Sequence, residues 1–262
     1  MWCIGKISGE YLSRMEDVLA LYHLPFDAKR PVVCLDELPF QMLGDVVEPL
    51  LMKTGSLKKF DYEYRRCGVA SVFVAFEPLT GKRLVRVYRR RTKADYCRFA
   101  REAADHWASA EAIVLVQDNL NTHHAGSFYE NLPPEKAYAL TKRFEFHYTP
   151  KKGSWLNMAE LELSALSRQC LARRIPDIDT LSRQLESIVK ERNKLEIKAK
   201  WQFTVENARE KLNRHSKYRT KATISTTYVT FVLYLGDFYN FQARFSFSIR
   251  TIMRSADRAE AE

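Results

Sequence analysis

The sequence has few cysteines, and none of them stand in a pattern that would pair them. There are 5 among 262 residues, with no Cys-x-x-Cys arrangement, so we expect neither a zinc site nor a disulfide framework. There is no basic N-terminal segment followed by an apolar stretch, and no apolar run of roughly 18–20 residues, so no signal peptide or spanning helix is expected. The chain also lacks internal repeats and low-complexity linkers. These absences favour a reducing cytoplasm.

Acidic residues are fewer than basic ones, with 32 Asp and Glu against 42 Lys and Arg. The formal net charge is +10 and the isoelectric point is about 9.3. Such an excess favours a polyanionic partner, with nucleic acid first and an anionic membrane second. Two basic clusters are Arg89-Arg90-Arg91 and Lys151-Lys152. Either could be only a solvated face, but we expect both to bind DNA phosphates, Lys151 and Lys152 above all.

The hydrophobic pattern predicts a single type of architecture. Helical spacing and capping predict helices at 10–24, 93–109, within 134–143, at 156–172, from Asp177 onward and at 205–213. Short apolar runs predict strands at 31–38, 69–76, 84–88, 112–118 and 144–149. This order predicts an α/β fold in which a mixed sheet is covered by helices.

Three acidic residues lie in distinctive sequence motifs. Asp36 ends Val32-Val33-Cys34-Leu35-Asp36, Asp118 follows the apolar run from Ile113, and Glu160 lies on a predicted helix. Neighbouring strands can place the two aspartates side by side, and a helix packed over the sheet can add Glu160. Three carboxylates gathered in this way suit a pair of hard divalent cations and phosphodiester chemistry.

Longer phrases around these residues resemble the DDE transposases of bacterial insertion sequences, within the mariner-type superfamily. The similarity is greatest to the insertion sequence six-thirty family and covers roughly residues 10–214. The stretches that carry it are Arg30–Glu37, Asp61–Tyr64, Phe76–Leu79, Val116–His123, Phe146–Glu160 and Leu166–Leu171.

The resemblance implies a ribonuclease-H-like core with a mixed five-stranded sheet flanked by helices. It also implies Asp36, Asp118 and Glu160 as the catalytic, metal-binding residues, with Mg²⁺ or Mn²⁺ as two bound ions. The chain before Asp36 is too short to hold the helix-turn-helix region that the family carries at its N-terminus, so we expect the catalytic domain only. The domains expected are an N-terminal helix and linker (1–30), the catalytic domain (31–214) and an atypical tail (215–262) of unknown structure.

Two neighbouring acidic residues compete with the motif positions. Positions two apart on a helix point about 200° apart, so Glu160 and Glu162 cannot both face one metal. The motif favours Glu160, which leaves Glu162 solvated or in a salt bridge. Glu37 should point to the other strand face from Asp36, although it could still support the site.

Polar and aromatic residues near the motifs have open roles. His123 could orient the Asp118 loop, contact phosphate or be a polar loop residue; we favour a supporting or structural role. Asn119 and Asn157 could line the site or only form turns. Trp155 could stack on a base or anchor its helix in the core.

The leading interpretation is the catalytic core of a DNA transposase. It would be an endonuclease with polynucleotidyl transferase activity that acts as a homodimer on double-stranded transposon ends and target DNA, in the bacterial cytoplasm at the nucleoid. A stand-alone ribonuclease-H-like nuclease is one alternative. The other is a truncated remnant that binds DNA or a partner without cutting.

Overall fold

The computed structural model describes residues 8–47 and 61–213, all within the first compact unit of the chain, Met1–Lys217. The tail at 215–262 lies outside these residues. Within them, no helix is long and apolar enough to cross a membrane. The elements are α1 (Gly9–Tyr22), β1 (Val32–Asp45), β2 (Tyr64–Phe76), β3 (Arg83–Tyr88), α2 (Lys93–His106), β4 (Ile113–Gln117), α3 (Gly126–Asn131), α4 (Pro134–Lys142), β5 (Phe144–Tyr148), a 3-10 turn η1 (Ser154–Leu156), α5 (Ala159–Leu166), a π turn η2 (Ser167–Leu171), α6 (Ile178–Lys194) and α7 (Val205–Asn213).

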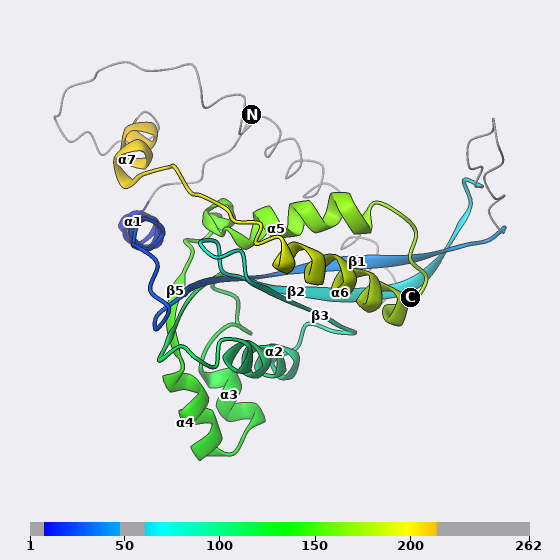
Figure 1. The fold of residues 1–262 in the computed structure, drawn as a ribbon, viewed down its shortest axis with the longest axis horizontal. Coiled ribbons are helices and arrows are strands. Elements are labelled where there is room, and N and C mark those ends of the chain that lie inside the picture. The colour runs from blue at the N-terminus through cyan, green and yellow to red at the C-terminus, as the bar shows by residue number, and fades with distance from the viewer. Residues whose placement is uncertain (1–7, 48–60, 214–262) are drawn as a thin grey trace. The chain divides into compact units, whose positions relative to one another are not determined.

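The five strands form one mixed sheet in the order β3-β2-β1-β4-β5. β2 pairs antiparallel with both β1 and β3, whereas β4 pairs parallel with both β1 and β5. Helices α5 and α6 cover one face of this sheet, and α2, α3 and α4 lie against the other (Figure 1). The predicted α/β fold with a mixed five-stranded sheet is therefore confirmed.

Alternation along β1 divides the apolar core between the two faces of the sheet. Val33 and Leu35 pack with the buried residues of α2 and with Phe128 of α3. Cys34 points the other way and packs in a second cluster with residues of α1 and the start of α5. Because side chains alternate along a strand, Asp36 falls on the Cys34 face and Glu37 on the α2 face.

The outer half of β1 was missed by the prediction. That prediction ended the strand at residue 38, and it began the next at residue 69. In the structure, β1 and β2 continue outward as a two-stranded ribbon, because residues 40–45 pair only with residues 64–70. Arg174 braces the ribbon, donating to Asp45 Oδ1 over 2.7 Å and to the carbonyl of Asp61 over 2.8 Å. The ribbon was missed because it is largely exposed and carries no continuous apolar run.

The helix predicted at 156–172 is broken into three pieces. Asn157 has an extended backbone between η1 and α5, and its side chain bonds both β1 and the first residue of α5. Its amide donates to the carbonyl of Leu35 over 2.7 Å, and its Oδ1 accepts from the backbone nitrogen of Ala159 over 3.1 Å. An Asn side chain that satisfies backbone groups in this way competes with the helix, which explains the interruption.

Other helix ends agree with the sequence signals. Asp177 caps α6, accepting from the Thr180 nitrogen over 2.7 Å as predicted. α1 packs through Tyr22, whose hydroxyl donates to the carbonyl of Leu156 over 2.7 Å and so ties α1 to the segment before α5. The short helix α3 was not predicted, because its six residues give no helical period.

Candidate active site

The register between β1 and β4 places Asp36 and Asp118 side by side, at the C-terminal end of β4. The strands run parallel, with Val32 opposite Val114 and Cys34 opposite Val116. Each aspartate lies two residues beyond that last pair, so both project on the same face. Only β4 ends there; β1 continues to Asp45, beyond residue 38 where its predicted strand ended.

Glu160 comes to this edge from the first turn of α5. Asn157 ties the start of that helix to the carbonyl of Leu35, the residue before Asp36. Ser154 supplies a side-chain hydrogen bond to the Glu160 carboxylate. The tie from Asn157 fixes where α5 begins relative to β1, and therefore where Glu160 lies relative to Asp36.

The three carboxylates interact electrostatically. Burial, followed by the charges of Glu160 and Asp118, raises the pKa of Asp36 well above its ordinary value. Burial and the charge of Asp118 also raise the pKa of Glu160 to about 7, although Ser154 opposes this rise. Neighbouring negative charges repel one another, so each carboxylate makes the ionised form of the others less favourable.

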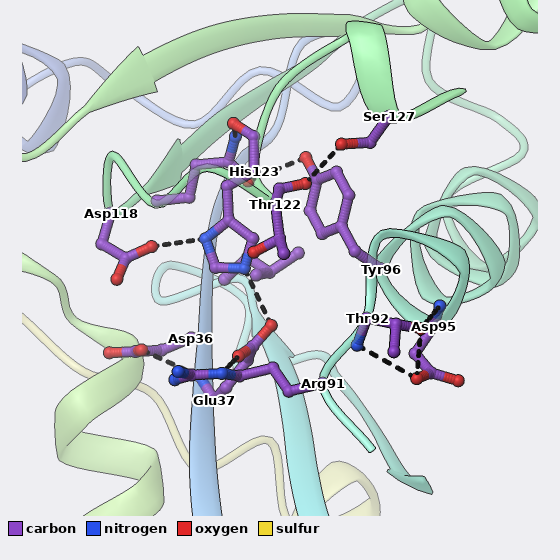
Figure 2. A network of polar contacts seen from close by, with 12 residues as sticks. Asp36, Glu37, Arg91, Thr92, Asp95, Tyr96, Asp118, Thr122, His123 and Ser127 are labelled. Carbon is purple, nitrogen blue, oxygen red and sulfur yellow. Dashed lines mark hydrogen bonds and ion pairs between the residues drawn. The ribbon is translucent and has the colours of Figure 1, made fainter. Parts of the chain in front are cut away.

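His123 lies between Asp118 and Glu37, the residue of β1 that points to the α2 face of the sheet (Figure 2). His123 Nδ1 contacts Asp118 Oδ1, and Nε2 lies 2.8 Å from Glu37 Oε1. Burial lowers the pKa of His123, but the hydrogen bonds to Asp118 and Glu37 outweigh it and bring the pKa to about 9. Glu37 Oε2 in turn lies 3.4 Å from Arg91 Nε.

The carboxylates suit a hard divalent cation by their chemistry. Oxygen ligands are what Mg²⁺ and Mn²⁺ prefer, and a cation would relieve the repulsion that raises the pKa of Asp36 and Glu160. Oδ1 of Asp36 accepts from the backbone nitrogen of Glu37, and Oδ1 of Asp118 contacts His123. Within residues 8–47 and 61–213, however, no three His, Cys, Asp or Glu side chains are gathered closely enough to surround one ion as they stand. Holding an ion would therefore require the carboxylates to draw together.

Comparison with known families decides the class of the protein. Residues 31–182 match the family described as DDE superfamily endonuclease, which is more than half of the chain. The chain belongs to the DDE superfamily endonucleases. The match includes Asp36, Asp118 and Glu160. A comparison with curated proteins finds no match.

Solved structures with the same fold as this DDE endonuclease are complexes of Mos1. The Mos1 mariner paired end complex with Mn is 13% identical with a TM-score of 0.53, covering 84% of this chain and 67% of that chain. The Mos1 strand transfer complex is 12% identical with a TM-score of 0.52, covering 84% and 66%. At these identities the likeness shows the fold alone, which is ribonuclease-H-like.

The basic residues of the DDE endonuclease expected to bind DNA are exposed. Lys151 and Lys152 form the turn just before Ser154, the residue that bonds Glu160. Arg89 and Arg90 are exposed between β3 and α2, where Arg91 also reaches Glu37. Two separate exposed loops thus carry the predicted phosphate contacts.

Glu162 points away from the other carboxylates, in agreement with the helical geometry. It is buried, and Arg192 binds both of its oxygens at 2.9 Å. Arg83 Nε lies 3.1 Å from Glu162 Oε1. Of the two roles left open for Glu162, the salt bridge is the observed one. It anchors α5 to β3 and α6 on the side opposite Glu160.

The remaining polar and aromatic candidates have different surroundings. Asn119 is exposed beside Asp118. Trp155 packs edge-on against Phe203, with ring centroids 5.8 Å apart, in the cluster around α1. This contact favours the anchoring role over base stacking. Sequence reasoning missed the part played by Tyr96, whose ring lies 4.9 Å from that of His123.

Proposed function

We propose that this DDE endonuclease is the catalytic core of a cut-and-paste DNA transposase related to the insertion sequence six-thirty family. It would cleave transposon-end DNA and join the freed 3′-hydroxyl to a target. The observation that supports it is that Asp36 of β1 and Asp118 after β4 project on one face of the sheet, with Glu160 of α5 near enough for its charge to raise the pKa of Asp36. The metal-dependent step is proposed, since the likeness to Mos1 complexes supports only the fold.

The carboxylates would hold two divalent ions, Mg²⁺ or Mn²⁺, as the resemblance implies. When bound, such ions lower the pKa of a water and stabilise the leaving oxygen of a phosphodiester. Asp36 and Asp118 would contribute from the sheet edge, and Glu160 from the helix. Exposed Lys151 and Lys152, in the turn before Ser154, would hold the DNA backbone beside these carboxylates.

DNA is the partner that the charge distribution supports. The chain carries a net charge of +10 although its proposed centre is acidic, and such an excess favours a polyanionic partner. Pairing two transposon ends requires two subunits, so we propose a homodimer on DNA.

A cleavage assay with a substrate panel tests this function. The chain would be incubated with Mg²⁺ or Mn²⁺ and three substrates: the DNA that flanks its own gene, unrelated duplex DNA, and an RNA–DNA hybrid. Nicking of the flanking DNA above the others supports a transposase. Equal cutting of both DNAs, or cutting of the hybrid alone, would instead support a general nuclease.

Two variants connect the activity to the site. Asp36→Asn and Asp118→Asn should each abolish cutting while keeping the circular dichroism of the folded protein. Binding of flanking DNA without any cutting by the unaltered chain would favour the non-cutting remnant. Undiminished cutting by either variant would refute the assignment.

A further inference from the structure

Charged side chains form a continuous chain from the proposed metal ligand Asp118 to the protein surface. His123 contacts Asp118 through Nδ1 and Glu37 through Nε2, the latter over 2.8 Å. Glu37 Oε2 lies 3.4 Å from Arg91 Nε. Figure 2 shows His123 between the two carboxylates, with Arg91 beside Glu37. Carboxylate, imidazole, carboxylate and guanidinium thus follow one another from Asp118 to Arg91.

The imidazole of His123 is fixed in one orientation. Its side chain is 0% exposed, and the Tyr96 ring packs against it at 4.9 Å. Tyr96 donates to Gln117 Oε1 over 3.0 Å, and Gln117 donates to the carbonyl of His123 over 3.0 Å. With its ring face, both ring nitrogens and its carbonyl engaged, His123 cannot turn without breaking several contacts.

Glu37 is the group that connects His123 to the sheet. It follows Asp36 on β1 but lies on the α2 face, and its side chain is only 2% exposed. A buried carboxylate is costly unless it is paired. Through its pairing with His123, Glu37 of β1 supports Asp118 from the α2 face of the sheet. It therefore takes up no space among the three carboxylates on the α5 face.

We propose that Glu37 is a positioning residue for Asp118, acting through His123. The histidine holds Asp118 Oδ1 in place, and Glu37 holds the histidine, so that the second oxygen of Asp118 is presented to a metal ion in a constant direction. This rests on the proposed function, because it takes Asp118 as a metal ligand. Partners of this kind around metal ligands are worth about 10–100-fold in metal affinity.

Mn²⁺ binding to the chain without DNA tests this role, read by the paramagnetic resonance of free Mn²⁺. Glu37→Leu removes the acceptor for His123 and should weaken Mn²⁺ binding about 10–100-fold. Glu37→Gln keeps an acceptor oxygen and should restore most of that loss. The matched control is Glu77→Leu: Glu77 is also buried and accepts from a ring nitrogen, Trp107 Nε1, over 2.6 Å. It should lower the melting temperature without changing Mn²⁺ affinity.

Mn²⁺ affinity in Glu37→Leu within about twofold of the unaltered chain would overturn the proposal. If that variant fails to fold, Glu37→Asp serves instead, because it keeps the charge but withdraws it from His123 by one methylene. It should also weaken Mn²⁺ binding about 10-fold, and unchanged affinity would again overturn the proposal. In a cleavage assay, excess Mn²⁺ should restore the rate of the Glu37 variants.

Asp36→Asn separates this proposal from the function on which it rests. Loss of Mn²⁺ binding in Asp36→Asn, together with normal binding in the Glu37 variants, would refute the positioning role alone. Normal Mn²⁺ binding in Asp36→Asn would refute the metal centre itself, and the positioning role with it.

Discussion

Glu160 and Glu162 lie two residues apart on α5, yet the same substitution should change stability in opposite directions. Glu160 lies with the repelling carboxylates, whereas Glu162 is paired with two buried arginines, Arg83 and Arg192. We therefore expect Glu160→Gln to stabilise the metal-free protein at pH 8 and Glu162→Gln to destabilise it.

The size of the first effect follows from the pKa of Glu160. Its rise from 4.5 to about 7 corresponds to about 3 kcal/mol, at about 1.4 kcal/mol per pKa unit. Since the folded-state pKa is the higher one, protonated Glu160 stabilises the fold by this amount below pH 4.5 relative to ionised Glu160. The contribution is lost as the pH rises through about 7. Burial is the largest cause of the rise, and a buried amide also bears part of that cost, so the expected gain at pH 8 is about 1–3 kcal/mol.

The second effect has the opposite sign because Glu162→Gln leaves two arginines without their carboxylate. Arg83 is 0% exposed and Arg192 only 11%, and breaking such a buried pair costs about 3–5 kcal/mol. At about 2–4 °C per kcal/mol for a domain of this size, the two variants should differ clearly in melting temperature.

Thermal unfolding in a chelator, at pH 8 and at pH 4, measures both variants. The gain in Glu160→Gln should vanish at pH 4, where Glu160 is protonated in both the folded and the unfolded state. Equal losses in the two variants at pH 8 would refute the electrostatic account of the site. Added Mg²⁺ should stabilise the unaltered chain more than Glu160→Gln.

Three further outcomes are expected. Asn157→Ala removes the bonds to Leu35 and Ala159, so it should cost about 1–3 kcal/mol and speed hydrogen exchange at the start of α5; unchanged exchange would argue against the tie. Neutralising Lys151 and Lys152 to Gln should reduce the salt dependence of DNA binding by about one unit of slope per lysine, and a slope equal to that of the unaltered chain would exclude phosphate contact. The His123 contribution to stability should be lost as the pH rises through about 9, because its folded-state pKa is the higher one; His123→Gln should flatten that part of the melting profile.

The sheet was predictable because its inner strands are buried on both faces. Continuous apolar runs identify such strands, and the two aspartates that follow them could be placed at one edge. The outer ribbon was not predictable, since it is exposed and held by backbone pairing and by Arg174, which no periodicity reports.

The site was predictable only in part. Helical geometry separated Glu160 from Glu162, and strand alternation placed Glu37 on the face opposite Asp36. Neither could show that Glu37 meets His123, because that contact joins residues 86 positions apart. Tyr96 is a core residue by every sequence signal, and only the fold shows that it also fixes His123.

The parallel pairing of β1 with β4 has a consequence for the newly made protein. Asp36 leaves the ribosome first, but its neighbour in the sheet belongs to a strand that begins at Ile113, and Glu160 follows later still. Chains emerge at about 5–20 residues per second, so the acidic centre stays incomplete for seconds after Asp36 and the Arg89-Arg90-Arg91 cluster have been made. A nascent chain interrupted before β4 therefore carries only Asp36 of the three carboxylates, and it lacks Lys151 and Lys152 as well.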